Sequence, residues 1–259
     1  MIRFRSLGSG STGNATLIEG RGGITTTRVL LDCGFSLREL EARLQRVGMA
    51  AHELDAVFIT HEHGDHVGCA LTLARRHDVP LWMSRGTWRA IGEPELPGLI
   101  HFARDGASIE VGDLELRPYT VPHDAAEPLQ ICFSDGAVRL GVLTDAGCAT
   151  EHLLANLQNC DALLLECNHE AELLARSRYP ESLKARIAGR LGHLSNDTAA
   201  RILRACLHGG LNHVVAAHLS EQNNRPDLAL AALQQASGGF SPRLSVANPL
   251  HGFDWIDVA

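Results

Sequence analysis

Four side chains that commonly bind metal ions lie within one stretch of six residues. They are His61, His63, Asp65 and His66, and they follow the apolar run 57–59, which predicts a buried strand. Neutral imidazole nitrogens and carboxylate oxygens are the ligands that zinc and similar divalent ions take in proteins. The alternative is a histidine-rich surface turn between a strand and a helix, and the density of ligands favours the metal site.

The spacing of these ligands predicts two neighbouring metal ions. His61 and His63 are two residues apart where the strand ends, so both side chains can point to the same side of the chain. Asp65 and His66 begin the segment 65–77, whose apolar residues recur at helical spacing, and a carboxylate is favoured at a helix start. The two pairs would therefore face two adjacent points.

The composition predicts a soluble, cytoplasmic protein. Of the 259 residues 45% are apolar, which is enough for a substantial core, and the net charge of −7 argues against nonspecific coating of nucleic acid. The seven cysteines are scattered without a CxxC pair, which favours reduced core thiols over disulfides. We expect no signal peptide and no membrane contact, because the first residues lack an apolar segment and no apolar run is long enough to cross a bilayer.

Hydrophobic periodicity predicts one domain, residues 1–259, in which strands and helices follow one another without a linker. The predicted strands cover 2–7, 15–20, 27–34, 57–59, 79–84, 108–113, 114–122, the hairpin 131–145, 162–167, 212–220 and, as the last, 243–248. The predicted helices cover 36–48, 65–77, 150–159, 170–178, 181–190, 196–210 and 225–236, with a short helix or turn at 86–92. The Gly- and Ser-rich loop 8–14 is either a β-turn or a phosphate-binding loop, and the missing Lys-Ser/Thr ending favours the turn.

The pattern His-x-His-x-Asp-His after an apolar strand resembles the signature of the metallo-β-lactamase superfamily. The resemblance implies an α/β fold, a single-domain αββα four-layer sandwich, and a binuclear hydrolase. The predicted order of strands and helices agrees with such a fold. It also implies two divalent metal ions as cofactors, with Zn2+ favoured and Mn2+ as the alternative.

Three residues further along the chain match the remaining ligands of this superfamily. His123 follows a predicted strand and would complete a three-histidine set with the first two histidines. The resemblance makes Asp145 the carboxylate that bridges both ions, although alone it would equally predict a helix cap, and it makes His218 the last ligand of the second ion. The implied ligand set is His61, His63, Asp65, His66, His123, Asp145 and His218.

A site of this kind is hydrolytic. A water or hydroxide held between two dications is acidified to near neutral pH, and the metals neutralise charge on an ester oxygen in the transition state. Besides binding a metal, Asp65 can orient or deprotonate that water. The fold does not choose the substrate, since the superfamily hydrolyses β-lactams, thioesters and phosphodiesters.

Two histidines outside the predicted ligand set bear on the substrate. His169 follows an apolar run and lies between Glu166 and Glu170, and a carboxylate beside a histidine can orient the imidazole for proton transfer. His193 lies just before a predicted helix. The alternatives are a hydrogen-bonded core histidine and a helix-cap histidine.

Several segments between residues 6 and 225 together resemble the YycJ-like branch of the superfamily, small proteins regarded as exonucleases that act on DNA. The segments are GSGSTGNATLIE, LLDCG, THEHGDH, ECNHE, GRLGHLSND and AHLSEQNN. By this resemblance His193 would contact or protonate the scissile phosphate, and His169 with a neighbouring Glu would assist the leaving group. The sequence leaves open which Glu pairs with His169.

Charge gives modest support for a nucleic acid substrate, with DNA favoured over RNA. The run 176–190 has a net charge of +4 and would hold a phosphate backbone if it lies beside the metals, whereas the alternative is an ordinary solvated helix face. Residues 146–217 leave no room for the β-CASP insertion of related nucleases. We therefore expect a weak grip on the substrate, or a grip supplied by a protein partner or a homodimer.

Two rival functions stay open on the sequence alone. One is a small-molecule hydrolase, either a glyoxalase II-like thioesterase or a cyclic-nucleotide phosphodiesterase, which the acidic charge and small size suit equally well. The other is a metal-binding regulatory protein whose site is inert.

Overall fold

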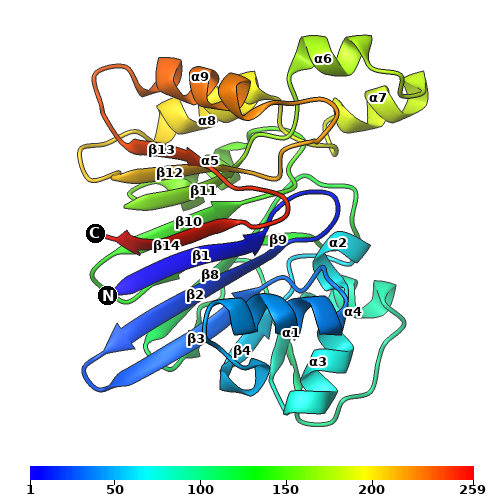
Figure 1. The fold of residues 1–259 in the computed structure, drawn as a ribbon, viewed down its shortest axis with the longest axis vertical. Coiled ribbons are helices and arrows are strands. Elements are labelled where there is room, and N and C mark those ends of the chain that lie inside the picture. The colour runs from blue at the N-terminus through cyan, green and yellow to red at the C-terminus, as the bar shows by residue number, and fades with distance from the viewer.

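Two seven-stranded sheets face each other in the computed structural model, which describes residues 1–259 (Figure 1). The strands of the first sheet are, in spatial order, β14 (Phe253–Val258), β1 (Ile2–Gly8), β2 (Ala15–Gly22), β3 (Thr25–Leu31), β4 (Ala56–Phe58), β5 (Leu81–Met83) and β6 (Ile100–Phe102). Those of the second sheet are β13 (Arg243–Val246), β12 (His213–Ala217), β11 (Ala162–Glu166), β10 (Arg139–Leu143), β9 (Leu129–Ser134), β8 (Leu114–Thr120) and β7 (Ile109–Val111). Strands β3 to β6 run parallel to one another, as do β10 to β13, so their carboxyl ends lie at one edge of each sheet.

Helices cover the outer face of both sheets (Figure 1). On the side of the first sheet lie α1 (Leu37–Arg46), the 3-10 helix η1 (Ala51–Glu53), α2 (Gly64–Val67), α3 (Ala70–His77) and α4 (Arg85–Ala90). On the side of the second sheet lie α5 (Glu151–Leu157), α8 (Asn196–Cys206) and α9 (Pro226–Ser237), while α6 (Ala171–Arg176) and α7 (Glu181–Ile187) project beyond the sandwich.

Three separate apolar clusters fill the three interfaces between the four layers. One lies between the sheets and contains residues from Ile2 to Val258. A second packs α1 and α3 against the first sheet through Leu40 and Leu73, and a third packs α5, α8 and α9 against the second sheet. The predicted αββα sandwich is therefore confirmed, and no β-CASP insertion interrupts it. None of the helices is long and apolar enough to cross a membrane.

The predicted helix 65–77 is wrong as a single helix, because the chain breaks it into α2 and α3. At the break Gly68 has φ 31°, and the backbone N–H of Cys69 donates to the carbonyl of Cys33 instead of continuing the helix. A Cβ atom on Gly68 would lie 2.3 Å from that carbonyl oxygen. Only glycine allows this close approach, which holds the ligand-bearing turn α2 against the end of β3.

Two strands were not predicted. The segment 243–248 is not the last strand, because β14 follows it and pairs antiparallel with β1, with Ile2 opposite Val258. The three residues of β6 add an edge strand to the first sheet. The pairing of β14 with β1 joins the last and the first strand of the chain, and the local pattern of residues does not indicate a contact between such distant segments.

Candidate metal centre

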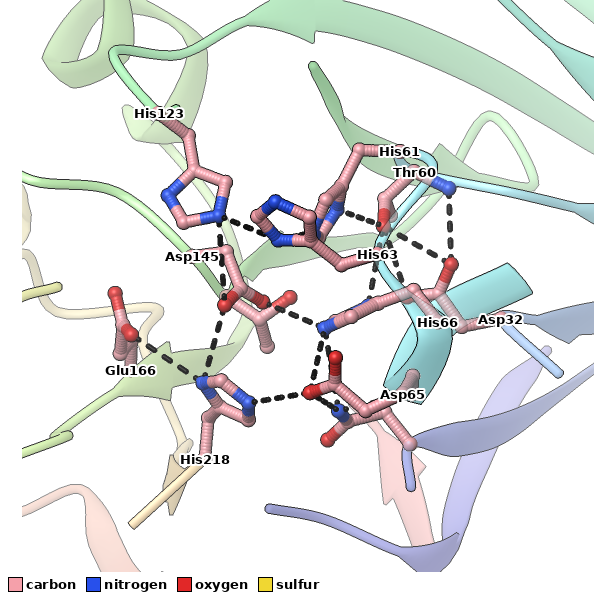
Figure 2. Close-up of polar contacts among 12 residues, drawn as sticks. Asp32, Thr60, His61, His63, Asp65, His66, His123, Asp145, Glu166 and His218 are labelled. Atoms are coloured by element: carbon pink, nitrogen blue, oxygen red, sulfur yellow. Dashed lines mark hydrogen bonds and ion pairs between the residues drawn. The ribbon is translucent and has the colours of Figure 1, made fainter. Parts of the chain in front are cut away.

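All seven predicted ligands meet at the edge where the parallel strands end, as Figure 2 shows. Three residues here, Asp32 after β3, Asp145 after β10 and His218 after β12, have φ of 60°, 58° and 53°. They are half of the six non-glycine residues with positive φ in the chain. This conformation costs free energy in an L-residue and clusters at functional sites, and here it turns three side chains out of their strands toward one another.

His61, His63 and His123, which we call the three-histidine subsite, point their ring nitrogens at one another. Nδ1 of His63 lies 3.0 Å from Nε2 of His61 and 3.3 Å from Nε2 of His123. The three side chains come from the end of β4, the turn before α2 and the loop after β8. They form one group whose donor atoms lie close enough to share an ion.

Hydrogen bonds on the outer side of two of these rings determine where their protons lie. Nδ1 of His123 is 3.0 Å from the carbonyl oxygen of Gly192, which can only accept. Nδ1 of His61 is 3.0 Å from Oγ1 of Thr60, whose hydroxyl hydrogen is directed to Asp32. Both Nδ1 atoms therefore donate, and both Nε2 atoms face the subsite as lone pairs. These two lone pairs point toward Nδ1 of His63, an arrangement that fits a cation bound between the three rings. Hydrogen bonds on the outer side, such as those with Thr60 and Gly192, orient histidine ligands.

Asp65, His66 and His218, which we call the Asp65 subsite, form a second group. Oδ2 of Asp65 lies 3.4 Å from Nε2 of His218 and 3.5 Å from Nε2 of His66. On the outer side, Nδ1 of His66 is 2.7 Å from Oδ2 of Asp32, and Nδ1 of His218 is 3.4 Å from Oε1 of Glu166. A buried carboxylate therefore holds each imidazole ring, which leaves each Nε2 facing the subsite.

The carboxylate of Asp145 lies between the two subsites (Figure 2). Its Oδ2 is 3.0 Å from Nε2 of His66, and its Oδ1 is 3.3 Å from Nδ1 of His218 and 4.0 Å from Nε2 of His123. The side chain is buried, and its Oδ2 accepts no hydrogen bond although His66 is so near. A buried charged oxygen without a hydrogen bond is costly, so this atom and the facing nitrogen fit a shared divalent cation.

The electrostatics of the two subsites differ. Burial lowers the pKa of His61 and of His123, so these rings are neutral, as metal ligation requires. Burial alone would also lower the pKa of His218, but Asp145, Asp65 and Glu166 outweigh it and raise that pKa to about 10. The Asp65 subsite is therefore anionic enough to hold a cation, whether protons or a metal ion.

A Glu–His pair lies beside the metal centre, but it is not the pair that the sequence predicted. Oε1 of Glu166 is 2.7 Å from Nδ1 of His193, and Oε2 of Glu166 accepts hydrogen bonds from the backbone of Ala146 and Leu194. Burial acts to lower the pKa of His193, and the contact with Glu166 reverses this and raises it. Because the side chain of His193 is 22% exposed, its ring can reach a bound molecule.

His169 is not hydrogen-bonded to any Glu side chain. It is only 3% exposed, its pKa is lowered by burial, and its Nδ1 has no hydrogen-bond partner. The expected His169–Glu pair is therefore not formed, because the buried carboxylate of Glu166 is directed to His193 and His218 and that of Glu170 accepts from Asn196.

Sequence reasoning did not assign roles to Asp32, Thr60 and Asn14, which contact the predicted ligands. Asp32 lies in LLDCG and Asn14 in GSGSTGN, two of the segments that carried the family resemblance, so a signal was present without an indication of the contact. Partners separated by 34 residues, as Asp32 and His66 are, depend on how the strand ends are turned.

Comparisons with known proteins agree with this geometry. The model of the Beta-lactamase superfamily domain matches residues 27–218. The chain is 31% identical over 237 residues to the exodeoxyribonuclease YycJ of Bacillus anthracis, covering 90% of this chain and 88% of that protein. It is also 31% identical over 233 residues to the exodeoxyribonuclease WalJ of Streptococcus pneumoniae, covering 88% of this chain and 85% of that one.

A solved structure extends the likeness to the fold. The metallo-β-lactamase fold protein YhfI from Bacillus subtilis superposes with a TM-score of 0.74 at 17% identity, over 99% of this chain and all of that one. The chain therefore belongs to the metallo-β-lactamase superfamily of hydrolases, in the same family as the YycJ and WalJ proteins.

Proposed function

We propose that the protein is a nuclease that uses two divalent metal ions to cleave phosphodiester bonds in DNA. The observation that carries the metal-dependent chemistry is the convergence of the seven predicted ligands, with the Oδ2 atom of Asp145 buried among them without a hydrogen bond. DNA as the substrate is supported by the likeness, over 90% of the chain, to a protein named exodeoxyribonuclease.

In this proposal each subsite holds one ion and Asp145 serves both. Five imidazole rings with two carboxylates suit zinc, and manganese is the alternative because the Asp65 subsite offers more oxygen. Bound ions would lower the pKa of an attacking water and neutralise charge on the phosphate in the transition state. Burial acts to raise the pKa of Asp65, but hydrogen bonds with His218 and His66 lower it far below the usual range. The carboxylate therefore stays ionised and can orient a water by accepting a hydrogen bond from it.

His193 is the acid of this proposal. Glu166 holds its Nδ1 and favours the protonated ring, which leaves Nε2 free to donate a proton to the leaving oxygen. The Glu–His pair therefore supports the proton-transfer role that the family resemblance implies for His193. The assisting role predicted for His169 stays a prediction, and its burial leads us to expect a smaller loss for His169→Ala than for His193→Ala.

Basic residues in and around α7 support a phosphate backbone as the substrate. Helix α7 has no buried residue and projects at the end of the sandwich where α2 carries its ligands (Figure 1). Nε of Arg186 lies 2.6 Å from Oδ2 of Asp124, the residue after His123, so α7 is tied directly to the three-histidine subsite. Arg178 and Arg190 are exposed and form no ion pair, which leaves two cations available to phosphates.

The substrate is tested by incubating the metal-loaded protein with end-labelled double-stranded and single-stranded DNA, RNA, a bis-aryl phosphodiester and a thioester. We expect DNA to be degraded, and the label position to give the polarity. His63→Ala should abolish turnover, because it removes the ligand that faces both other rings of its subsite. Turnover of the thioester without DNA cleavage would overturn the proposal, and DNA cleavage that survives His63→Ala would point to another site or a contaminant.

The acid role is tested with His193→Ala. We expect about two metal ions per chain to remain, while turnover falls on the order of 10²-fold or more for a lost acid–base group. Loss of metal ions would instead make His193 a ligand or a support. His208→Ala is a suitable control, since His208 bonds the carbonyl of Cys160 outside the centre.

A further inference from the structure

The glycine-rich loop between β1 and β2 is folded onto the metal centre. Three of its backbone N–H groups, those of Gly10, Gly13 and Asn14, donate within the protein. Gly10 N donates to Oδ1 of Asn14 at 2.9 Å, and Gly13 N donates to the carbonyl of Gly10 at 3.0 Å. The N–H of Asn14 donates to the carbonyl of Asp65 at 2.8 Å. These groups are therefore not directed outward as a phosphate-binding loop requires, which favours another role for the loop.

The side chain of Asn14 is fixed with its amide nitrogen toward the Asp65 subsite. Because Oδ1 accepts from the N–H of Gly10, the orientation of the amide is fixed, and Nδ2 also lies 3.2 Å from the carbonyl oxygen of Gly10. Nδ2 lies 3.3 Å from Oδ2 of Asp65, 3.2 Å from the carbonyl of Asp65 and 3.2 Å from Nε2 of His66. The residue is 6% exposed, so its two N–H groups find their partners within the protein.

The backbone around Asn14 also fixes Asp65. The carbonyl of Asn14 accepts from the N–H of Gly34 at 2.9 Å, and a Cβ atom on Gly34 would lie 1.7 Å from the carbonyl oxygen of Asp65. Asp65 is thus held between two backbone segments, while its carboxylate is reached only by the Asn14 amide and the two histidines of its own subsite.

The same loop reaches the subsite from its other end. The backbone N–H of His218 donates to Oγ of Ser9 at 2.9 Å, and His218 is one of the residues with positive φ. The first and last residues of the loop therefore hold two of the three members of the Asp65 subsite. No hydrogen bond joins the loop to the three-histidine subsite, whose outer partners are Thr60 and Gly192.

We infer that Asn14 is a positioning residue that holds the carboxylate of Asp65 for the second metal ion. The inference rests on the metal centre proposed above. Nε2 of His66 has one lone pair, so when a metal ion takes it the Asn14 amide keeps Asp65 as its side-chain partner. Oδ2 of Asp65 then accepts a hydrogen bond from Asn14, which fixes the carboxylate before the metal ion binds. Metal binding therefore costs less conformational entropy.

The test is Asn14→Ala measured by metal affinity, not by activity. Each subsite is isolated by a background substitution: His63→Ala leaves the Asp65 subsite, and His218→Ala leaves the three-histidine subsite. The metal-free proteins are titrated with Zn2+ in competition with a chromophoric chelator. We expect Asn14→Ala to raise the Kd of the Asp65 subsite about 10–100-fold, the usual effect of losing an outer partner of a ligand, and to change that of the three-histidine subsite by less than about twofold.

Thr12→Ala is the matched control, because Thr12 is exposed in the same loop and its side chain has no hydrogen bond. An equal effect of Asn14→Ala in both backgrounds, or none in either, overturns the inference. Should Asn14→Ala fail to fold by circular dichroism, Asn14→Ser decides, since it keeps a small polar group near Gly10 but is too short to reach Asp65. Fewer than two Zn2+ ions on the unsubstituted protein would instead overturn the proposed metal centre.

Discussion

Both subsites of the metal centre contain imidazole rings, but the partners on the outer side of those rings differ in charge. In the three-histidine subsite the outer partners are a hydroxyl and a backbone carbonyl, Thr60 and Gly192. In the Asp65 subsite the outer partners are the buried carboxylates Asp32 and Glu166. Burial lowers the pKa of His61 and of His123 and keeps these rings uncharged, whereas the surrounding carboxylates outweigh burial and raise the pKa of His66 and of His218.

This difference predicts how each subsite responds to substitution. Neutral rings need no proton to leave before they bind a metal ion, so the three-histidine subsite depends mainly on geometry. The Asp65 subsite gathers negative charge that must be compensated, so removal of one carboxylate or one donor there should cost more. The comparison can be tested at the shared residue Asp145 and at the outer partners Asp32 and Thr60.

The largest effect is expected where the two subsites meet. Asp145→Asn keeps the size of the side chain and tolerates the left-handed backbone, but it removes the charge between the subsites. We expect both Zn2+ affinities to fall and turnover of the bis-aryl phosphodiester to drop on the order of 10³-fold or more, because metal ions contribute several kcal/mol to the transition state. Metal analysis and steady-state kinetics measure this.

The control for Asp145→Asn is Asp78→Asn, since Asp78 has the same φ of 58° at the end of α3, away from the centre. Its metal content and turnover should match the unsubstituted protein. Two ions per chain and activity within tenfold in Asp145→Asn would contradict a shared role for this carboxylate.

A smaller and selective effect is expected for Asp32→Asn. The ion pair with His66 at 2.7 Å is lost, while the amide oxygen can still accept from Thr60. We expect the Kd of the Asp65 subsite for Zn2+ to rise about 10–100-fold, as for other outer carboxylate partners of histidine ligands. The three-histidine subsite should change several-fold less, and equal losses in the His63→Ala and His218→Ala backgrounds would break the comparison.

The fold and the ligand candidates could be predicted from the sequence, partly from local patterns and partly from the resemblance to the superfamily. Apolar alternation marks the strands, and His and Asp residues at strand ends mark the site. The layers then bring the seven predicted ligands together, although their role as ligands stays a prediction. The strands β6 and β14 were missed because a short edge strand and a pairing between the two ends of the chain have no local signal.

The partners of the ligands could not be predicted, because they depend on backbone turns at strand ends. Glu166 pairs with His193, 27 residues away, and not with the neighbouring His169. The left-handed residues Asp32 and His218 redirect their side chains by an amount that residue type alone does not specify. Neighbourhood in sequence therefore did not indicate that Glu166 contacts His193, and the catalytic roles of His193 and His169 stay predictions.

The smallest effect is expected for Thr60→Val, which tests the other side of the comparison. Valine keeps the shape of the fully buried side chain but removes the oxygen that accepts from Nδ1 of His61. The substitution also removes the hydrogen bond from the Thr60 hydroxyl to Asp32. Of the two bonds lost, the one with His61 supports the three-histidine subsite and is worth about 1 kcal/mol, so the Kd of that subsite for Zn2+ should rise about fivefold. Asp32 still accepts from the backbone N–H of Thr60 at 2.9 Å and still binds His66, so the Asp65 subsite should change by less than about twofold.

The control is Thr87→Val, since Thr87 is also fully buried and its hydroxyl contacts Ser84. It should lower the free energy of unfolding similarly without changing either Kd. A larger loss at the Asp65 subsite than at the three-histidine subsite would show that Thr60 acts through Asp32, and the two subsites would then share one support instead of two.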